Sequence, residues 1–453
     1  MCIAVKTVFR LIFRIISKIK LKYVALGIGT IAVMDMFGAF THIMETTYDE
    51  SFSYPYDGDV QPFIFALRNK QKPDVPPINE YNHTFLLTPQ RTCNDLEYLS
   101  LRIVFLVKSS MENFDRRIAI RNSWGFEKRF FDVSSKTVFL LGIRPGEEEL
   151  QAKIKLESQK YQDIVQADFV DSYFNNTIKT MTGFRWASEE CSNSKFYMFV
   201  DDDIYVSVKN VLRFVRNPAN YPDYLKESRR FSGRKREIRD SDVPDNFKLL
   251  ERERRMSAKE KIELRRKPGW SSHNKTKFIY EKEDLNTTNV DSVDSLRSFQ
   301  NQSNFNKSSK ILSRKKRQVF DFELPDDVRL YSGFVFVSAP HRHKTSKWYV
   351  SLEEYPYHLW PPYVTAGSYI LSKEALLDMY YTSFYTKHFR FDDIFLGLVA
   401  KKADIEPFHC EEFHFYKKDY NKYNYKYVVT SHGYGNPEEL MEIWNEQKAM
   451  GNA

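Results

Sequence analysis

The sequence predicts an α/β domain built around a mainly parallel sheet, and three observations lead to this prediction. Apolar runs of strand length alternate with longer segments that have helical spacing. Strands that alternate with helices favour parallel pairing, because each helix returns the chain to the start of the next strand. An acidic triplet follows the fourth run, at the strand end where ligands bind in such sheets. The runs are residues 101–107, 137–141, 163–169 and 195–200, and the helical segments are 147–161 and 177–191.

Composition limits the class of protein. The chain has 453 residues, of which 42% are hydrophobic and 15% aromatic, so it can bury a substantial core. The net charge of +8 would suit a nucleic-acid binder, but the excess of Lys and Arg lies in residues 1–22 and 226–270. Local basic segments do not make a charged face on a folded domain. We therefore expect no nucleic-acid partner.

The N-terminal segment predicts a membrane anchor. Residues 23–44 are mostly apolar and interrupted by Asp35, and their length is close to the roughly 20 residues that a helix needs to cross a bilayer. Residues 1–22 carry Lys and Arg without any acid, which predicts a cytoplasmic tail. A cleaved signal peptide and a buried soluble helix are the alternatives. Residues 45–92, rich in Pro, Tyr and Asn, are typical of a stem.

Sequons and cysteines agree with a lumenal location after the anchor. Three cysteines follow it, Cys93, Cys191 and Cys410. An oxidising lumen permits one disulfide and leaves one thiol over, and the sequence does not say which pair forms. The N-glycosylation sequons lie at Asn82, Asn175, Asn274, Asn286, Asn301 and Asn306.

A charged segment divides the predicted domain. Residues 226–325 are rich in Asn, Ser and charges and have few apolar runs, which predicts a poorly ordered insertion. Arg317 ends a basic run that would suit a processing protease, although an ordinary charge run is the simpler interpretation. The catalytic domain is therefore expected to comprise residues 93–225 and 326–453.

The acidic triplet Asp201, Asp202 and Asp203 predicts a metal site. Three carboxylates at the end of a buried strand repel one another, and a hard divalent cation removes this repulsion while also binding phosphate oxygens. The alternative is that the acids cap a turn or a helix.

Two further groups of residues suit the same chemistry. Asp392 and Asp393 precede an apolar helical segment, where a carboxylate would serve either as a general base or as a helix cap. Arg117 and Arg121 suit a phosphate or a salt bridge equally well.

Taken in order, these segments resemble the β1,3-galactosyltransferase family, which includes β1,3-N-acetylglucosaminyltransferases and, more distantly, the Fringe enzymes. The resemblance covers about residues 93–448, and its order makes it specific. The matching segments are residues 117–125, 168–180, 201–206, 347–351 with 354–356, 361–369, 392–397, and 430–432 with 437–444.

The resemblance implies a GT-A fold, in which a Rossmann-like nucleotide-binding half with a mixed sheet joins an acceptor-binding half. It implies inverting transfer from a UDP-sugar, usually with Mn²⁺, by a single-pass type II enzyme of the Golgi membrane whose catalytic domain is lumenal. Asp203, Asp201 and His432 match the metal site, and Asp393 matches the general base, with Asp392 as its close alternative. The residues expected on the donor side are Arg117, Arg121, Lys179, Asp201, Asp202 and Gly367.

The predicted activity is β1,3 transfer of a hexose, with galactose as the preferred sugar, to a glycan on a glycoprotein, glycolipid or proteoglycan. N-acetylglucosamine and N-acetylgalactosamine remain alternatives, because a few pocket contacts decide between them. A glycan-binding protein without turnover is a third possibility. Two departures from the family pattern are mild: Asp392 stands where Glu is common, and Gly367-Ser368 where Gly-Gly is common.

Overall fold

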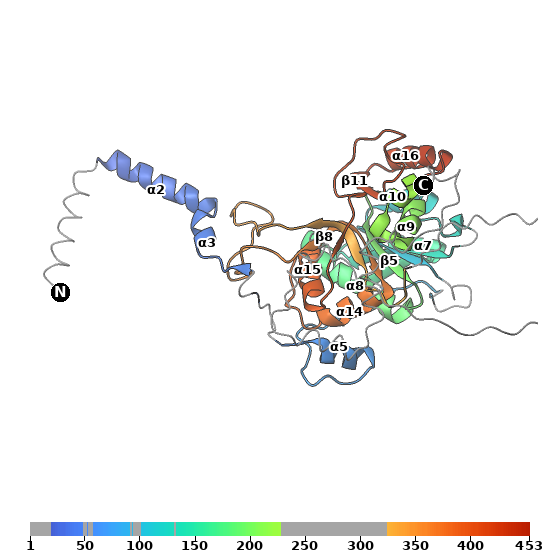
Figure 1. Cartoon of the computed structure of the whole chain (residues 1–453), viewed down its shortest axis with the longest axis horizontal. Coiled ribbons are helices and arrows are strands. Elements are labelled where there is room, and N and C mark those ends of the chain that lie inside the picture. The colour runs from blue at the N-terminus through green and yellow to red at the C-terminus, as the bar shows by residue number, and fades with distance from the viewer. Residues whose placement is uncertain are drawn as a thin grey trace, which may run out of the picture. The chain divides into compact units, whose positions relative to one another are not determined.

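The computed structural model (Figure 1) describes residues 20–48, 52, 58–90, 93, 101–130, 133–227 and 324–453. The chain forms two compact units, one of Met1–Val215 with Pro325–Ala453 and one of Arg216–Leu324. In the second unit, the short helix α10 (Asp223–Glu227) is the main described element. The predicted insertion of residues 226–325 and Arg317 lie almost wholly outside the described residues.

An eight-stranded mixed sheet forms the centre of the first unit. Its strand order is β1-β4-β3-β2-β5-β8-β7-β9. The four neighbours β4, β3, β2 and β5 are parallel, whereas β8 pairs antiparallel with both β5 and β7. The strands are β1 (Phe85–Leu87), β2 (Ile103–Lys108), β3 (Ser135–Ile143), β4 (Ile164–Val170), β5 (Phe196–Asp201), β7 (Tyr331–Phe336), β8 (Tyr363–Ser372) and β9 (Phe408–His409).

The parallel strands confirm the prediction of a mainly parallel α/β sheet. Each of the four predicted apolar runs forms one of them, and β2 is buried along its whole length because the sheet is covered there. The antiparallel insertion of β8 makes the sheet mixed. The helices of this unit include α6 (Phe114–Asn122), α7 (Glu148–Tyr161), α8 (Asn176–Glu190), α9 (Val208–Arg216), α14 (Lys373–Ser383), α15 (Asp392–Lys402) and α16 (Pro437–Ala449).

Stacked aromatic rings fill the core between α8 and the sheet. The rings of Phe184 and Phe199 lie 4.8 Å apart, and those of Phe199 and Tyr369 lie 5.1 Å apart. Offset stacking of this kind adds to the stabilisation that burial provides. The stack therefore joins α8 to β5 and β8, the two strands whose ends border the candidate site.

A smaller three-stranded sheet connects the C-terminal segment to the acidic triplet. It consists of β10 (Phe413–His414), β11 (Thr430–His432) and β6 (Ile204–Val206) in that order. In the antiparallel register of β11 and β6, His432 lies opposite Ile204. This register brings a histidine from late in the chain to the residue that follows Asp203.

The cysteines agree with the predicted count of one disulfide and one thiol. Cys93 forms a disulfide with Cys191, across 98 residues of sequence. Cys410 is a buried free thiol. Burial raises the pKa of Cys410 to about 12, so this thiol is unreactive at neutral pH.

Two short helices cover the predicted anchor segment, α2 (Leu21–Met36) and α3 (Ala39–Ile43), with Gly38 at positive φ between them. Of the helices among the described residues, none has the length and apolar character that a membrane span requires.

Part of the predicted stem packs against the folded unit. The helix α5 (Gln61–Arg68) contacts α14, where Arg68 pairs with Glu374 and Asp378, and β1 adds an edge strand to the main sheet. These contacts attach residues 61–68 and 85–87 to the folded unit, before the predicted start of the domain at residue 93.

Candidate active site

The acidic triplet lies where the main sheet ends and the small sheet begins. Asp201 is the last residue of β5, Asp202 and Asp203 form the turn, and β6 follows. Successive side chains of the turn point in different directions, so the three carboxylates do not share one environment. This placement explains why a tight run of acids is tolerated at the end of a buried strand.

Asp202 points towards α6 and is bound entirely by protein groups. Its carboxylate, 7% exposed, accepts hydrogen bonds from Ser109 Oγ (2.7 Å), Asn113 Nδ2 (2.9 Å) and Arg116 Nη1 (2.9 Å). These bonds hold the loop after β2 and the start of α6 against the turn. The predicted role of Asp202 in donor binding therefore remains a prediction, and the contacts show a positioning role.

Lys108 joins the two acidic motifs. It ends β2 directly beside Asp201, and its ammonium is 3.0 Å from Asp201 Oδ1, 2.9 Å from Asp392 Oδ2 and 3.0 Å from the Ala366 carbonyl. Burial alone would lower the pKa of Lys108, but the two carboxylates raise it above its ordinary value, so the side chain stays charged.

The two carboxyl groups that Lys108 contacts differ in pKa. Burial, opposed by Lys108 and reinforced by Asp203 and Asp392, raises the pKa of Asp201 to about 6. Burial would also raise the pKa of Asp392, but the charge of Lys108 and a hydrogen bond from Thr180 Oγ1 (3.0 Å) outweigh it and lower that pKa. Asp392 is thus a stable anion that holds Lys108 in place.

Asp203 and His432 lie beside each other on the open side of the turn. His432 Nε2 is 3.4 Å from Asp203 Oδ2, and the Tyr434 amide donates to the Asp203 carbonyl at 2.7 Å. Within the described part of the chain, Asp203 Oδ1 is buried and has no hydrogen-bond partner. A buried carboxylate oxygen without a donor is costly, and a cation would relieve that cost.

Gly367 of β8 faces the same space. A Cβ atom placed on Gly367 would lie 3.6 Å from Ile204 Cδ1, 3.9 Å from Asp201 Oδ2 and 3.9 Å from His432 Cδ2. The missing side chain therefore leaves room between Asp201 and His432. Three residues from three distant segments converge on this space.

The donor set fits a hard divalent cation, although it is not a preformed metal site. Carboxylate and imidazole groups suit Mn²⁺ or Mg²⁺, and the unpartnered oxygen of Asp203 faces no competing donor among the described residues. Over that same part of the chain, no three His, Cys, Asp or Glu side chains are grouped closely enough to hold a metal ion by themselves. A metal would therefore need oxygens from a ligand or from water, as Mg²⁺ and similar ions often do in phosphate sites.

Asp392 and Asp393 begin α15, and only Asp392 is paired with Lys108. The carboxylate of Asp393 accepts a hydrogen bond from the amide of Ile394 at 2.8 Å. Burial and repulsion by Asp392 raise the pKa of Asp393 to about 7. A carboxyl group with a pKa near neutrality is suited to accept a proton, so the two adjacent acids have different environments and different chemical capacities.

Tyr363 lies beside Asp393 at the start of β8. Gly397 is one helical turn after Asp393 on α15, and a Cβ atom on Gly397 would come within 2.6 Å of Tyr363 Cβ. Burial and the charge of Asp393 raise the pKa of Tyr363, and the hydrogen bond with Ser338 opposes this rise only in part. The phenol therefore stays neutral and can donate a hydrogen bond near the carboxyl group of Asp393.

The three cations predicted on the donor side form ion pairs within the protein. The fully buried Arg117 pairs with Glu157, Arg121 with Glu157 and Asp163, and Lys179 with Asp171. Each pair satisfies a carboxylate that burial would otherwise penalise. Of the two interpretations open for the arginines, the structure shows salt bridges, and their part in donor binding remains a prediction.

Two of these cations also hold the loop after β2. Arg117 donates to Ser109 Oγ, the Ser110 carbonyl and the Met111 carbonyl, and Lys179 donates to the Ser109 carbonyl at 2.6 Å. This loop lies at the carboxyl end of a parallel strand, where nucleotides bind in such sheets. The cations therefore shape the backbone at the expected donor side.

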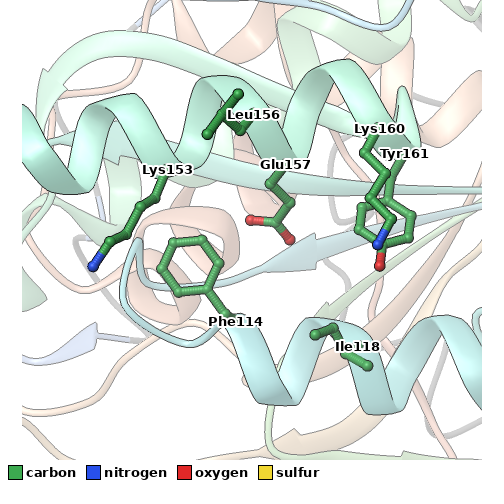
Figure 2. Close-up of a pocket in the computed structure, with 7 residues that line it drawn as sticks. All are labelled: Phe114, Ile118, Lys153, Leu156, Glu157, Lys160 and Tyr161. Atoms are coloured by element: carbon green, nitrogen blue, oxygen red, sulfur yellow. The ribbon is translucent and has the colours of Figure 1, made fainter.

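An open pocket of about 300 Å³ lies between α6 and α7, away from the acidic motifs. Figure 2 shows Phe114 and Ile118 on α6, facing the α7 side chains of Lys153, Leu156, Glu157, Lys160 and Tyr161. Its acid, Glu157, is already bound by Arg117 and Arg121. The pocket therefore has no free acid–base pair, and the candidate active site is the space around Asp203, Gly367 and Asp393.

Sequence reasoning did not identify Lys108. A signal was present, because Lys108 ends a run of five apolar residues and a charged residue at the end of a buried strand calls for a partner. Its partners lie 93 and 284 positions further along the chain, so their identity required the fold.

Comparison with known proteins identifies the family. Residues 115–244 and 310–411 match the family described as Galactosyltransferase. The β-1,3-galactosyltransferase brn of Drosophila melanogaster is 33% identical over 424 residues, covering 93% of this chain and 94% of the relative.

Two further relatives are 26% identical. β-1,3-Galactosyltransferase 1 of Mus musculus matches over 374 residues, 82% of this chain and 81% of the relative. Lactosylceramide 1,3-N-acetyl-β-D-glucosaminyltransferase B of Danio rerio matches over 419 residues, 90% of this chain and 78% of the relative. The resemblance predicted from the sequence motifs is confirmed, and the chain belongs to the galactosyltransferase family and is a glycosyltransferase.

Proposed function

We propose that the chain is an inverting β1,3-galactosyltransferase that transfers galactose from UDP-galactose to a glycan acceptor. The observation that carries the proposal is the contact of Lys108 with Asp201 and Asp392, which brings the two acidic motifs together. The match to the Drosophila melanogaster β-1,3-galactosyltransferase over nearly the whole chain supports galactose as the sugar.

On the donor side, Asp203, Asp201 and His432 would hold Mn²⁺, which when bound neutralises the diphosphate of the leaving group. Asp202 keeps the turn in place, and Arg117, Arg121 and Lys179 keep the loop after β2 and its supporting helices in position for the nucleotide. Gly367 leaves space for the donor between Asp201 and His432.

On the acceptor side, Asp393 acts as the general base. The acceptor oxygen forms a bond to the anomeric carbon as the bond from that carbon to the diphosphate oxygen breaks, and UDP leaves with the electron pair. The proton of the acceptor hydroxyl moves to Asp393, whose raised pKa suits this role. One displacement inverts the anomeric centre, so an α-linked donor yields a β-linked product.

The proposal includes a location. Residues 1–22 form a cytoplasmic tail, residues 23–44 anchor the chain in the Golgi membrane, and residues 45–92 form the stem of a lumenal enzyme with catalytic segments 93–225 and 326–453. The cytoplasmic basic flank and the sequons support this topology. The acceptor glycan belongs to a glycoprotein, glycolipid or proteoglycan.

A second candidate is β1,3 transfer of N-acetylglucosamine, which the similarity to the Danio rerio enzyme favours. The test incubates the detergent-solubilised full chain with Mn²⁺, a panel of UDP-sugars and methyl glycoside acceptors, and follows UDP release and product linkage by NMR. UDP-galactose should give a β1,3-linked product. Transfer only from UDP-N-acetylglucosamine would select the second candidate, whereas an α-linked product or no transfer from any UDP-sugar would overturn the proposed mechanism.

A further inference from the structure

An aromatic surface extends outward from the candidate base. It consists of Phe334 and Phe336 of β7, Tyr363 of β8, and Phe415 and Tyr416, which follow β10. The ring centroids are 5.9 Å apart for Phe336 and Tyr363, 4.8 Å for Phe336 and Phe415, and 5.1 Å for Phe415 and Tyr416. The rings therefore form one continuous path rather than scattered contacts.

The inner end of the aromatic surface adjoins Asp393. Tyr363 packs against Gly397, one turn from Asp393 on the same face of α15, and its phenol shares a hydrogen bond of 2.9 Å with Ser338 Oγ. A molecule bound with a hydroxyl at Asp393 would therefore lie beside Tyr363, and Phe336 is the next ring along the surface.

The outer end of the aromatic surface is open to solvent. Phe415 is 42% exposed and Tyr416 is 52% exposed. Large apolar side chains that gather on a surface next to a reactive group mark a binding site, because leaving them exposed costs free energy without a ligand. Phe334 packs against the rings of Phe336 and Phe415, and its ring centroid lies 4.9 Å from that of His409.

A carbohydrate fits this surface better than a fully apolar ligand. The C–H bonds on one face of a sugar ring carry partial positive charge and are attracted to the negative face of an aromatic ring. Sugar hydroxyls need hydrogen-bond partners at the rim, and the Tyr363 and Ser338 hydroxyls lie at the inner end, while His414 and Lys418 lie at the outer end beside Tyr416. The surface thus combines apolar faces with polar edges.

We propose that the aromatic surface binds the acceptor glycan, with the reacting sugar at Tyr363 and Asp393 and the preceding sugars stacked on Phe336, Phe415 and Tyr416. This inference rests on the proposed function, because it assigns the acceptor side of the same site. It identifies the substrate class as a glycan of at least two sugars.

The experiment compares Phe415→Ala and Tyr416→Ala with wild type on two acceptors, the methyl β-glycoside of the sugar that accepts transfer and the methyl glycoside of a disaccharide ending in that sugar. The variants should lose roughly 10-fold in kcat/KM on the disaccharide, since an aromatic contact of this kind is worth about one order of magnitude, and far less on the monosaccharide. Tyr423→Ala, which removes a ring that is 67% exposed elsewhere, is the control and should behave as wild type.

Three other outcomes would overturn the inference. Equal losses on both acceptors would indicate a structural effect, and no loss on either would show that the surface is unused. An octyl glycoside whose advantage over the methyl glycoside depends on Phe415 would indicate a lipid site instead.

A binding measurement separates this inference from the proposed function. If wild type transfers no sugar, the proposed function fails. Saturation-transfer NMR of the disaccharide, with UDP and Mn²⁺ present, then still reports whether the signal depends on Phe415 and Tyr416. A signal that persists in both variants would also end the inference.

Discussion

Lys108 Nζ lies 2.9 Å from Oδ2 of Asp392, and this buried ion pair joins β2 to the first residue of α15. The same ammonium contacts Asp201 at 3.0 Å, so one cation balances an acid from each motif. The pairing divides the adjacent acids Asp392 and Asp393 into a charged anchor and a carboxyl group of raised pKa. The predictions below follow from this division.

Lys108→Met should destabilise the fold and abolish transfer. The substitution keeps the length of the side chain but leaves the buried carboxylate of Asp392 and the partly buried carboxylate of Asp201 without their cation. Breaking a buried ion pair in this way typically costs about 3–5 kcal/mol. Urea unfolding of the variant measures the loss. Lys195→Met is the matched control, because Lys195 pairs with Asp326 at the surface, where such a pair is worth about 1 kcal/mol or less. Equal losses in the two variants would show that the buried pair does not stabilise the site.

Asp393→Asn should lose about 10²–10⁴-fold in kcat while its affinity for UDP with Mn²⁺ stays close to that of wild type. The amide nearly preserves size but cannot accept the proton. Wild-type kcat/KM should rise with pH up to about 7 and then level, because the base must be deprotonated. Steady-state kinetics over pH 5–9 test both points. If Asp392→Asn loses turnover and Asp393→Asn does not, the roles are reversed.

The same substitution should stabilise the protein at alkaline pH. The pKa of Asp393 is raised from 3.8 to about 7 in the folded chain, so wild-type stability falls as pH rises from about 4, where the unfolded group ionises, to about 7, and is then level. Asp393→Asn removes this loss, so its Tm should exceed that of wild type at pH 8.5, and the difference should be smaller at pH 5.5. A variant that is less stable at both pH values would contradict the raised pKa.

Asp203→Asn should weaken UDP binding only when Mn²⁺ is present. The amide keeps the shape of the turn and removes the charge of a buried oxygen that has no partner among the described residues. Calorimetric titration with UDP, in Mn²⁺ and in EDTA, measures the difference. Asp326→Asn changes the same charge at a side chain that is 80% exposed and should bind UDP as wild type does. An equal loss with and without Mn²⁺ would remove Asp203 from the metal site.

Two glycine substitutions should separate donor space from packing. Gly367→Ala places a methyl group at ordinary contact distances from Ile204, Asp201 and His432, so stability should change by no more than about 0.5 kcal/mol while KM for the UDP-sugar rises. Gly397→Ala places a methyl group 2.6 Å from Tyr363 Cβ and should cost about 1–3 kcal/mol through overpacking. Thermal unfolding and donor KM measure both; a normal KM in Gly367→Ala would place the donor elsewhere.

Local patterns were sufficient to predict the elements and the position of the chemistry. The apolar runs at residues 101–107 and 195–200 became β2 and β5, because a stretch that is apolar throughout must be buried on both faces of a sheet. The same reasoning located Asp201 at a strand end and Asp393 at a helix start. The cysteine count limited the chain to one disulfide after the anchor, but not to the pair Cys93–Cys191.

Tertiary structure decided which distant side chains meet and which way they face. Asp202 turns to Ser109 and Arg116 although its neighbours face the open site, and Lys108 meets an acid 284 positions away. The sequence alone determined the family, the elements and the acidic motifs, since these depend on local periodicity and residue order. The partners of each charge were decided only in the fold, because strand order and the cost of burying an unpaired charge select them after the sheet has formed.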